Sequence, residues 1–209
     1  MKNFTHTIQF VSLLLLPPFL YCSQPETAIV LKNAKTKHLP AMAALTRSLF
    51  YEDFKPIMLT GYADRFVVKF GLTDYALDSW ISDRAEYAKK SCQNQIQKDE
   101  NTIIALDGKK IVGFCNFEKK EDNNNKKMVF ISFLGVDKNH RKQGIGTQLL
   151  TEAITTFDDV DTCQLALLAY ANDATQQFYE KRKFTNCGLL TVTLLAPDTH
   201  YLYVRQLKQ

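Results

Sequence analysis

The stretch that decides the fold is Leu134-Gly-Val-Asp-Lys-Asn-His-Arg-Lys-Gln-Gly-Ile-Gly-Thr-Gln-Leu-Leu150. It overlaps a nearly continuous apolar run, residues 128–136, which is typical of a buried strand. Apolar residues then recur at helical spacing, at Ile145, Leu149, Leu150, Ala153, Ile154 and Phe157. The stretch therefore predicts a strand that ends at Val136 and a glycine-bearing loop that turns into a helix near Gly144.

A turn of this kind is a candidate site for an anion. The first N–H groups of a helix have no acceptor within the helix, and the positive end of the helix dipole strengthens their attraction for negative charge. Gly144 and Gly146 let the backbone approach a ligand closely, and Arg141 and Lys142 add full positive charge at the rim. We therefore expect a phosphate or diphosphate here. An isolated Gly-x-Gly is weak evidence, because many helices simply begin near glycines.

Two known anion-binding loops do not match this stretch. A P-loop requires four residues between its glycines and then Gly-Lys-Ser/Thr, and that order is absent here. A dinucleotide fingerprint requires a third glycine where this chain has Leu149, and it opens the first strand–helix–strand unit of a larger sheet. The sequence thus excludes these two classes of nucleotide site.

The rest of the chain predicts further strands and helices. Before the loop we expect a strand at 28–32, a helix from Thr36 or Lys37 that buries Leu39, Met42, Leu45 and Leu49, an irregular aromatic-rich segment at 50–75, and a helix at 73–92. Asp107-Gly108 predicts a tight turn between strands at 102–106 and 110–118, followed by a polar connection at 119–127. After the loop helix we expect a strand at 165–170, a helix at 173–183, and strands at 189–195 and 201–207.

The order of these elements predicts one mixed α/β domain. Strands 128–136 and 165–170 are joined by a helix, so they should run parallel, whereas the hairpins should be antiparallel. No internal repeat and no linker-like segment interrupts the pattern.

Composition agrees with a globular domain. Of 209 residues, 45% are hydrophobic and 23% charged, which excludes disordered, collagen-like and disulfide-scaffold proteins. The formal charge is +4, from 26 basic and 22 acidic residues. So small a surplus suits a polyanionic ligand but does not indicate nucleic acid, and we expect none as a partner.

The first 23 residues form a separate segment. Lys2 precedes an almost wholly apolar run at 10–22, which is shorter than the roughly 20 residues that span a bilayer and is interrupted by Pro17-Pro18. We therefore expect a signal peptide at 1–23 and export, with no transmembrane span. A cytoplasmic location stays open if the segment is retained or reflects a false start, because bulky Tyr21 makes a poor cleavage site.

Cysteines and histidines predict no metal site. The cysteines, at 22, 92, 115, 163 and 187, form no Cys-x-x-Cys pair, and the four histidines have no ligand spacing. Cys115 and Cys163 lie in apolar runs and should be small core residues. A disulfide among the other cysteines is allowed in an exported protein, but the sequence does not select one.

Residues 136–146 resemble the acetyl-CoA-binding motif of the GNAT superfamily of acyl-CoA N-acyltransferases. That motif reads Gln/Arg-x-x-Gly-x-Gly/Ala after a strand that ends in a Val-Asp-like pair, and here it is Arg141-Lys-Gln-Gly-Ile-Gly146 after Val136-Asp137. A second signature has an asparagine at a helix start, a tyrosine seven residues later and Gly-Phe beyond. Its counterparts here are Asn172, Tyr179 and Lys183-Phe184, with Lys183 in place of the usual glycine and Thr175 in place of the usual alanine.

The resemblance covers roughly residues 28–209, which it identifies as an N-acetyltransferase domain. It implies an α/β (mixed α+β), GNAT-like fold, in which a central, mostly antiparallel twisted sheet contains one parallel, splayed strand pair and is flanked by helices. It also implies acetyl-CoA as co-substrate. The implied cofactor-binding residues are Leu134, Val136, Arg141, Lys142, Gln143, Gly144, Ile145, Gly146, Thr147 and Asn172.

These residues have different implied roles. The diphosphate of CoA would bind the N–H groups from Gln143 to Thr147. The pantetheine arm would lie between the splayed strands and pair with the backbone of Leu134 and Val136, as in strand addition. Asn172 would reach the pantetheine arm, cap its own helix, or do both.

The implied activity is that of an acyltransferase, which moves an acetyl group to a primary amine by direct attack in a ternary complex. The acceptor is an unidentified small-molecule or protein amine, and with a pKa of about 10 it must first lose a proton. A strand N–H, from Val136 or Leu134, would stabilise the oxyanion, and Tyr179 would act as the acid for the departing thiolate. We expect Tyr179 to face away from the core, because Phe178 fits the buried face of its helix better.

The general base is not identified. Many family members carry a carboxylate on the strand before the loop, but residues 128–134 contain none, and Glu118, Asp53 or a chain of waters stay open. The missing carboxylate favours the alternative of a non-catalytic CoA-binding or sensing protein. A purely structural secreted protein is disfavoured, because the motif residues Arg141, Gly144, Gly146, Asn172 and Tyr179 are all present. Export also conflicts with acetyl transfer, because acetyl-CoA is a cytosolic metabolite.

Overall fold

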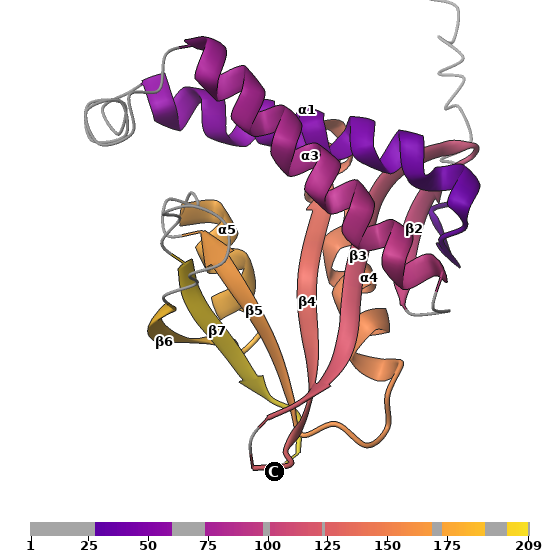
Figure 1. The fold of residues 1–209 in the computed structure, drawn as a ribbon. Coiled ribbons are helices and arrows are strands. Elements are labelled where there is room, and N and C mark those ends of the chain that lie inside the picture. Colours follow the sequence, from indigo (N-terminus) through magenta and orange to yellow (C-terminus); the bar gives the residue numbers. More distant parts are fainter. Residues whose placement is uncertain are drawn as a thin grey trace, which may run out of the picture.

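The computed structural model describes residues 28–59, 74–97, 101–122, 124–168, 173–190 and 200–208. They form a seven-stranded sheet with helices on both faces (Figure 1). The expected signal peptide at 1–23 lies outside the described residues and stays a prediction. Within the described ranges, no helix is both long and apolar enough to cross a membrane.

The strands follow the order β1-β2-β3-β4-β5-β7-β6 across the sheet. They are β1 (Val30–Asn33), β2 (Thr102–Asp107), β3 (Lys110–Glu121), β4 (Lys127–Val136), β5 (Thr162–Leu168), β6 (Thr185–Leu190) and β7 (His200–Gln206). Only β4 and β5 pair in parallel among the described strands, and the other neighbours are antiparallel. The predicted mixed fold with one parallel strand pair is therefore confirmed.

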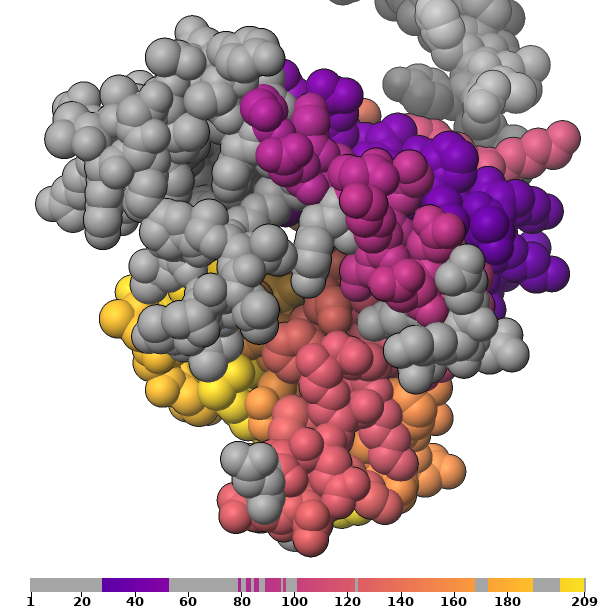
Figure 2. Space-filling model, viewed as in Figure 1, coloured from indigo at the N-terminus to yellow at the C-terminus, as the bar shows by residue number. Residues whose placement is uncertain are grey.

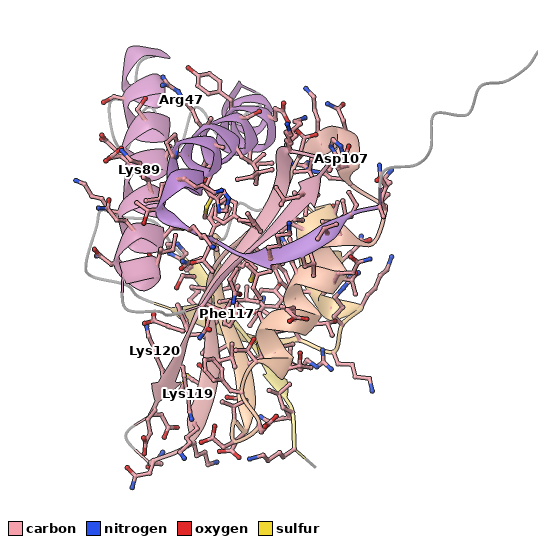
Figure 3. All side chains as sticks on the ribbon, turned by 90° about the vertical axis from the view of Figure 1, so that its right-hand side faces the viewer. Arg47, Lys89, Asp107, Phe117, Lys119 and Lys120 are labelled. Carbon is pink, nitrogen blue, oxygen red and sulfur yellow. The ribbon has the colours of Figure 1, made fainter. Side chains whose placement is uncertain are left out.

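Helices cover the two faces of the sheet with separate cores. A short helical turn, η1 (Thr36–His38), leads into α1 (Leu39–Leu59), which packs with α3 (Asp74–Gln97) on one face. The other face carries α4 (Ile145–Thr155) and α5 (Asp173–Glu180). Alternation along β3 divides the cores, because Phe114 lies under α1 and α3 whereas Cys115 lies under α4 and α5. Figure 3 shows the sheet between the two layers of helices, and Figure 2 shows side chains of α3 on the surface that faces the viewer.

Strands β4 and β5 separate part-way along their length. They pair from Met128↔Thr162 to Ile131↔Leu165, after which β5 continues with β7 while β4 continues with β3 (Figure 1). Ser132 lies at the point of separation as the extra residue of a β-bulge, because Ile131 pairs with Phe117 and Phe133 with Asn116. The expected splayed pair is therefore present, and β4 from Ser132 to Val136 leaves one edge without a strand partner among the described residues.

Several predicted boundaries were wrong: the helix expected at 73–92 runs to Gln97, the strand expected at 165–170 begins at Thr162, the helix expected at 173–183 ends at Glu180, and three more differ as follows. The helix expected to give way to an irregular segment at residue 50 continues to Leu59, and residues 60–73 lie outside the described range. Strand β3 extends into the expected polar connection as far as Glu121, because its charged side chains at 118–121 remain at least partly solvated while the backbone pairs with β4. Strand β6 begins at Thr185 rather than Leu189, because it pairs with β7 through a bulge between Asn186 and Leu189 that the apolar pattern does not reveal.

The described cysteines are all free thiols. Cys92, Cys115 and Cys163 are buried, which confirms that Cys115 and Cys163 are core residues, whereas Cys187 is exposed. Burial raises the pKa of Cys92 and of Cys163 to about 12, with a hydrogen bond from Asn116 partly opposing the shift at Cys92. Burial also raises the pKa of Cys115 well above its usual value. These three thiols therefore carry almost no thiolate near neutral pH.

Native-state alkylation should distinguish these cysteines. With iodoacetamide at about pH 7.5, we expect Cys187 to be modified and Cys92, Cys115 and Cys163 to react only after unfolding, because the thiolate is the nucleophile. Peptide mass spectrometry before and after denaturation measures the pattern. Rapid modification of any of the three buried thiols in folded protein would contradict the described packing.

The turn after α5 compensates for its missing glycine. Lys183 has a φ of +65°, and the N–H groups of Lys183 and Phe184 donate to the carbonyls of Glu180 and Tyr179 at 2.9 and 3.2 Å. This is a Schellman motif, in which a left-handed residue closes the helix and an apolar contact accompanies it. That contact joins the rings of Tyr179 and Phe184, whose centroids are 5.7 Å apart. The turn usual for glycine is therefore formed with a lysine.

Lys183→Gly should stabilise the protein. A side chain in the left-handed region costs about 1–2 kcal/mol, of which the greater freedom of glycine in the unfolded chain offsets about half. We expect Tm to rise by about 2–3 °C in a thermal unfolding experiment. Lys181→Gly is the matched control, because residue 181 is not among those with positive φ, and it should lower Tm. An unchanged or lower Tm for Lys183→Gly would show that Lys183 is not strained.

Candidate active site

The free edge of β4 presents the backbone groups that a strand-like ligand would use. The N–H of Asp137 donates to Val112 of β3 at 2.8 Å, so alternation directs the N–H and C=O groups of Leu134 and Val136 away from β3. The Val136 carbonyl accepts a hydrogen bond of 3.0 Å from Nε of Arg141. The Leu134 backbone and the Val136 N–H therefore face the side on which β5 has separated.

Gly135 brings α1 close to this edge. A Cβ at this position would lie 2.5 Å from Cδ1 of Leu49 on α1 and 2.8 Å from the Phe133 ring. No larger residue fits without displacing one of them. The glycine therefore lets α1 pack directly on one face of β4 between Leu134 and Val136, and this contact holds the free edge of the strand in position.

The loop after β4 is held by a histidine between two carboxylates. Asp137 caps the short turn η2 (Lys138–His140) by accepting from the Asn139 N–H at 3.0 Å. His140 contacts Oδ1 of Asp137 through Nδ1 at 2.8 Å and Oδ2 of Asp107 through Nε2 at 3.3 Å. Asp107 is the last residue of β2 and is labelled near the top of Figure 3, so its contact with His140 ties the loop to the β2–β3 hairpin.

The same contacts keep Asp137 ionised. Burial alone would raise its pKa, but the hydrogen bonds from His140 and from the Asn139 N–H, with the positive charge of Lys110, together lower it. Lys110 lies 3.5 Å from Oδ2. The loop therefore starts from a fixed anionic anchor.

The loop itself adopts the conformation expected of an anion site. Lys142 and Gly144 have φ of +64° and +83°, and Gly144 is the N-cap of α4. Arg141, Lys142, Gln143 and Gly144 are exposed, whereas Ile145 is buried in the core under α4. Gly146 is half-buried. It packs so closely on the Phe178 ring of α5 that a Cβ at this position would lie 3.3 Å from the ring.

Five consecutive amides at this turn have no acceptor. Within the part of the chain that the structure describes, no hydrogen bond is found for the N–H groups of residues 142–146. The N–H of Thr147, by contrast, donates to the Gly144 carbonyl at 2.9 Å. Thr147 therefore differs from its neighbours, because its N–H is already used within the helix start. The others are available to a ligand.

Tyr179 lies in the core, contrary to the expected orientation. It is buried beside Phe184 and Tyr203, whereas Phe178 is only partly buried, because Phe178 packs on Gly146 at the edge of the helix layer. Burial raises the pKa of the Tyr179 phenol well above its usual value, Cys115 and Cys163 raise it further, and Arg182 opposes the shift. Tyr179 is therefore neutral and keeps its proton near neutral pH.

Arg182 is a residue that the sequence analysis missed. It follows α5 and donates to Oγ1 of Thr147 through Nε at 3.2 Å and also through Nη2. It thereby joins the second signature to the first turn of α4. Its sequence neighbours, two lysines, offered no signal that would distinguish it.

The other expected residues are less informative. Asn172 lies outside the described residues, as does the side chain of Asp53. Glu118 pairs with Lys120 at 2.7 Å and faces Phe130 in the β3–β4 register, beyond the separation of the strands. Among the described residues no group of three or more His, Cys, Asp and Glu side chains has the arrangement of a metal site.

Comparison with known proteins identifies the family. Residues 70–184, more than half of the chain, match the model of the acetyltransferase (GNAT) family. The chain belongs to this family. It is therefore an acyltransferase, and its general chemistry is acetyl transfer. No curated protein sequence is significantly similar to the chain.

Solved GNAT acetyltransferases share the fold. PaiA N-acetyltransferase from Thermoplasma acidophilum, in complex with coenzyme A, is 18% identical with a TM-score of 0.61 over 86% of this chain and 99% of that one. A GNAT acetyltransferase from Staphylococcus aureus Mu50 is 20% identical, with a TM-score of 0.60 over 87% and 100%. Naa50 from Arabidopsis thaliana, bound to the bisubstrate analogue CoA-Ac-MVNAL, is 18% identical, with a TM-score of 0.53 over 85% and 97%.

Proposed function

We propose that this acetyltransferase moves an acetyl group from acetyl-CoA to a primary amine by direct attack in a ternary complex. The observation that carries the proposal is the run of five amides without acceptors at the start of α4, which directly follows the free edge of β4. PaiA was solved with coenzyme A, and Naa50 with a CoA-linked peptide, which supports this cofactor and an amine acceptor. Residues 28–209 make up the domain, since β1 and β7 lie outside the matched range but in the same sheet.

The amides at the α4 start bind the diphosphate of acetyl-CoA. Gln143, Gly144, Ile145 and Gly146 supply free N–H groups, and Arg141 and Lys142 supply positive charge. The pantetheine arm takes the place that β5 leaves beside β4. There it pairs with the Leu134 backbone and the Val136 N–H, as a peptide pairs with an exposed sheet edge. The predicted contact of Asn172 with this arm is part of the proposal and lies outside the described residues.

The reaction needs little besides orientation and hydrogen bonds. The deprotonated amine nitrogen attacks the thioester carbonyl carbon, and the negative charge that forms on its oxygen is stabilised by whichever N–H of Leu134 or Val136 the pantetheine arm leaves unpaired. The carbon–sulfur bond then breaks, the amine nitrogen loses its second proton, and the products are an amide and CoA. Tyr179 donates a hydrogen bond to the departing thiolate, since its raised pKa keeps the phenol protonated.

The alternative is a CoA-binding protein that does not transfer the acetyl group. It is favoured by one observation, the absence of a carboxylate from the β4 sequence before the loop. A thiolate with a pKa near 8.5 is a tolerable leaving group, so the reaction depends less on an acid than on a deprotonated amine.

Two measurements test the proposal in order. Calorimetry with CoA establishes binding, and incubation of acetyl-CoA with a panel of polyamines, small amines and peptide N-termini follows release of CoA and the acetylated product by mass spectrometry. We expect saturable binding and amine-dependent release. Binding without turnover for any amine, at pH values up to about 9, would favour the non-catalytic alternative. No binding would refute both.

A further inference from the structure

The guanidinium of Arg182 is fixed between α5 and the start of α4. Nη1 donates to the Phe178 carbonyl at 2.6 Å, and the guanidinium carbon lies 3.7 Å from the centroid of the Phe178 ring. The other two nitrogens, Nε and Nη2, each donate a hydrogen bond to Oγ1 of Thr147. Burial lowers the pKa of Arg182, but the ordinary pKa of arginine is so high that the guanidinium remains a cation. Carbonyl, ring and hydroxyl therefore determine its position.

The two bonds to Thr147 leave one role for its hydroxyl. A threonine hydroxyl has two acceptor lone pairs and one donor proton. Both N–H groups of Arg182 address the oxygen, so its proton is left to donate to a further acceptor. The Thr147 N–H is already bonded to Gly144, so the side chain is the part of this residue that can reach a ligand.

Phe178 links the same cluster to the glycine of the loop. Its ring contacts the position that a Cβ of Gly146 would occupy, at 3.3 Å, and its other side is covered by the guanidinium. Phe178 and Arg182 of the α5 region thus contact two adjacent residues of the first turn of α4, Gly146 and Thr147. This packing holds the turn that carries the free amides.

We propose that Arg182 is a positioning residue that orients the Thr147 hydroxyl to donate a hydrogen bond to the diphosphate of CoA. The inference rests on the proposed binding of acetyl-CoA at the start of α4. Arg182 acts through Thr147 and does not touch the reacting atoms. Its removal should therefore weaken cofactor binding and leave the chemical step unchanged.

The test uses Arg182→Met, Thr147→Val, their combination, and Thr147→Ser. Calorimetry gives the Kd for CoA, and steady-state kinetics give KM for acetyl-CoA and kcat. We expect each single variant to weaken CoA binding and raise KM about tenfold, as for loss of one hydrogen bond to a charged group, with kcat within twofold. The double variant should bind CoA no more weakly than the less tightly binding of the two single variants, because both substitutions remove the same interaction. Thr147→Ser should restore most of the affinity.

Controls separate positioning from loss of charge and from loss of the fold. Lys181→Met removes one charge from the same exposed turn, where no contact to the loop is found, and should leave the Kd unchanged. Dephospho-CoA keeps the diphosphate but lacks the ribose 3′-phosphate. Arg182→Met should weaken the binding of dephospho-CoA by the same factor as the binding of CoA. Thermal unfolding of each variant verifies that it is folded at the assay temperature.

The following outcomes would refute the role of Arg182 or the proposed function. If the effects of Arg182→Met and Thr147→Val multiply, or if Thr147→Val binds CoA as tightly as the wild type, the inference is wrong. A fall in kcat at unchanged KM would also refute it. If the wild-type protein itself binds no CoA, the proposed function fails and the inference fails with it. Tight wild-type binding with an unaffected Arg182→Met variant refutes the inference alone.

Discussion

Gly144→Glu is expected to reduce the affinity for CoA by about 100-fold or more. Gly144 has a φ of +83°, which costs a residue with a side chain about 1–2 kcal/mol. The new carboxylate would also stand among the free amides and repel the diphosphate, adding a penalty of a few kcal/mol at a partly exposed site. A repulsion of roughly 3 kcal/mol corresponds to a 100-fold change in Kd, and the strain adds to it as far as the free loop relaxes away from the binding conformation. Calorimetry with CoA measures the result.

Matched variants separate the two penalties. Gly144→Ala adds the strain without the charge and should weaken binding less than Gly144→Glu. Gly188→Glu has the same kind of strain, at a φ of +98° with no atom within 4 Å of a Cβ, but lies on β6 away from the loop. It should lower Tm and leave the Kd for CoA unchanged. Equal CoA affinity for Gly144→Glu and the wild type would remove the basis of the proposed function.

The anion loop was predictable because its determinants are local. A buried strand, two nearby glycines and a helical apolar pattern all lie within residues 128–157, so strand, loop and helix follow from the sequence. The positive φ of Gly144 and the buried Ile145 then agree with the prediction. Residues with a backbone role are the ones that such local reasoning finds.

The contacts that fix the loop were not predictable because they join distant parts of the chain. Asp107 and His140 are 33 residues apart, and Thr147 and Arg182 are 35 apart. Nothing in the spacing of either pair indicates that the side chains meet. The orientation of Tyr179 was predicted wrongly for the same reason. Phe178 packs on Gly146 of another helix, and Tyr179 occupies the core position instead.

Tyr179→Phe is expected to lower kcat by about 10- to 100-fold with little change in the Kd for acetyl-CoA. The substitution removes the phenol that we propose donates to the departing thiolate, which would be a hydrogen bond to a charged atom. The loss stays moderate because a thiolate leaves without full protonation. The aromatic ring remains and keeps its edge-to-face contacts with Phe178 and Phe184. Steady-state kinetics at saturating acetyl-CoA and amine, with calorimetry for Kd, give the two values separately.

Tyr203→Phe is the control that makes the result specific. Tyr203 is also buried, its ring centroid lies 6.2 Å from that of Tyr179, and among the described residues its hydroxyl has no partner of hydrogen-bond geometry. Burial raises the pKa of Tyr203, the negative charge of Glu180 raises it further, and Asn186 partly opposes the shift. Removing this hydroxyl should leave kcat unchanged. An equal fall in kcat for both variants would mean that any loss of polarity in this core slows the enzyme. An unchanged kcat for Tyr179→Phe would mean that the thiolate departs without help from Tyr179, and only the second signature's binding role would remain.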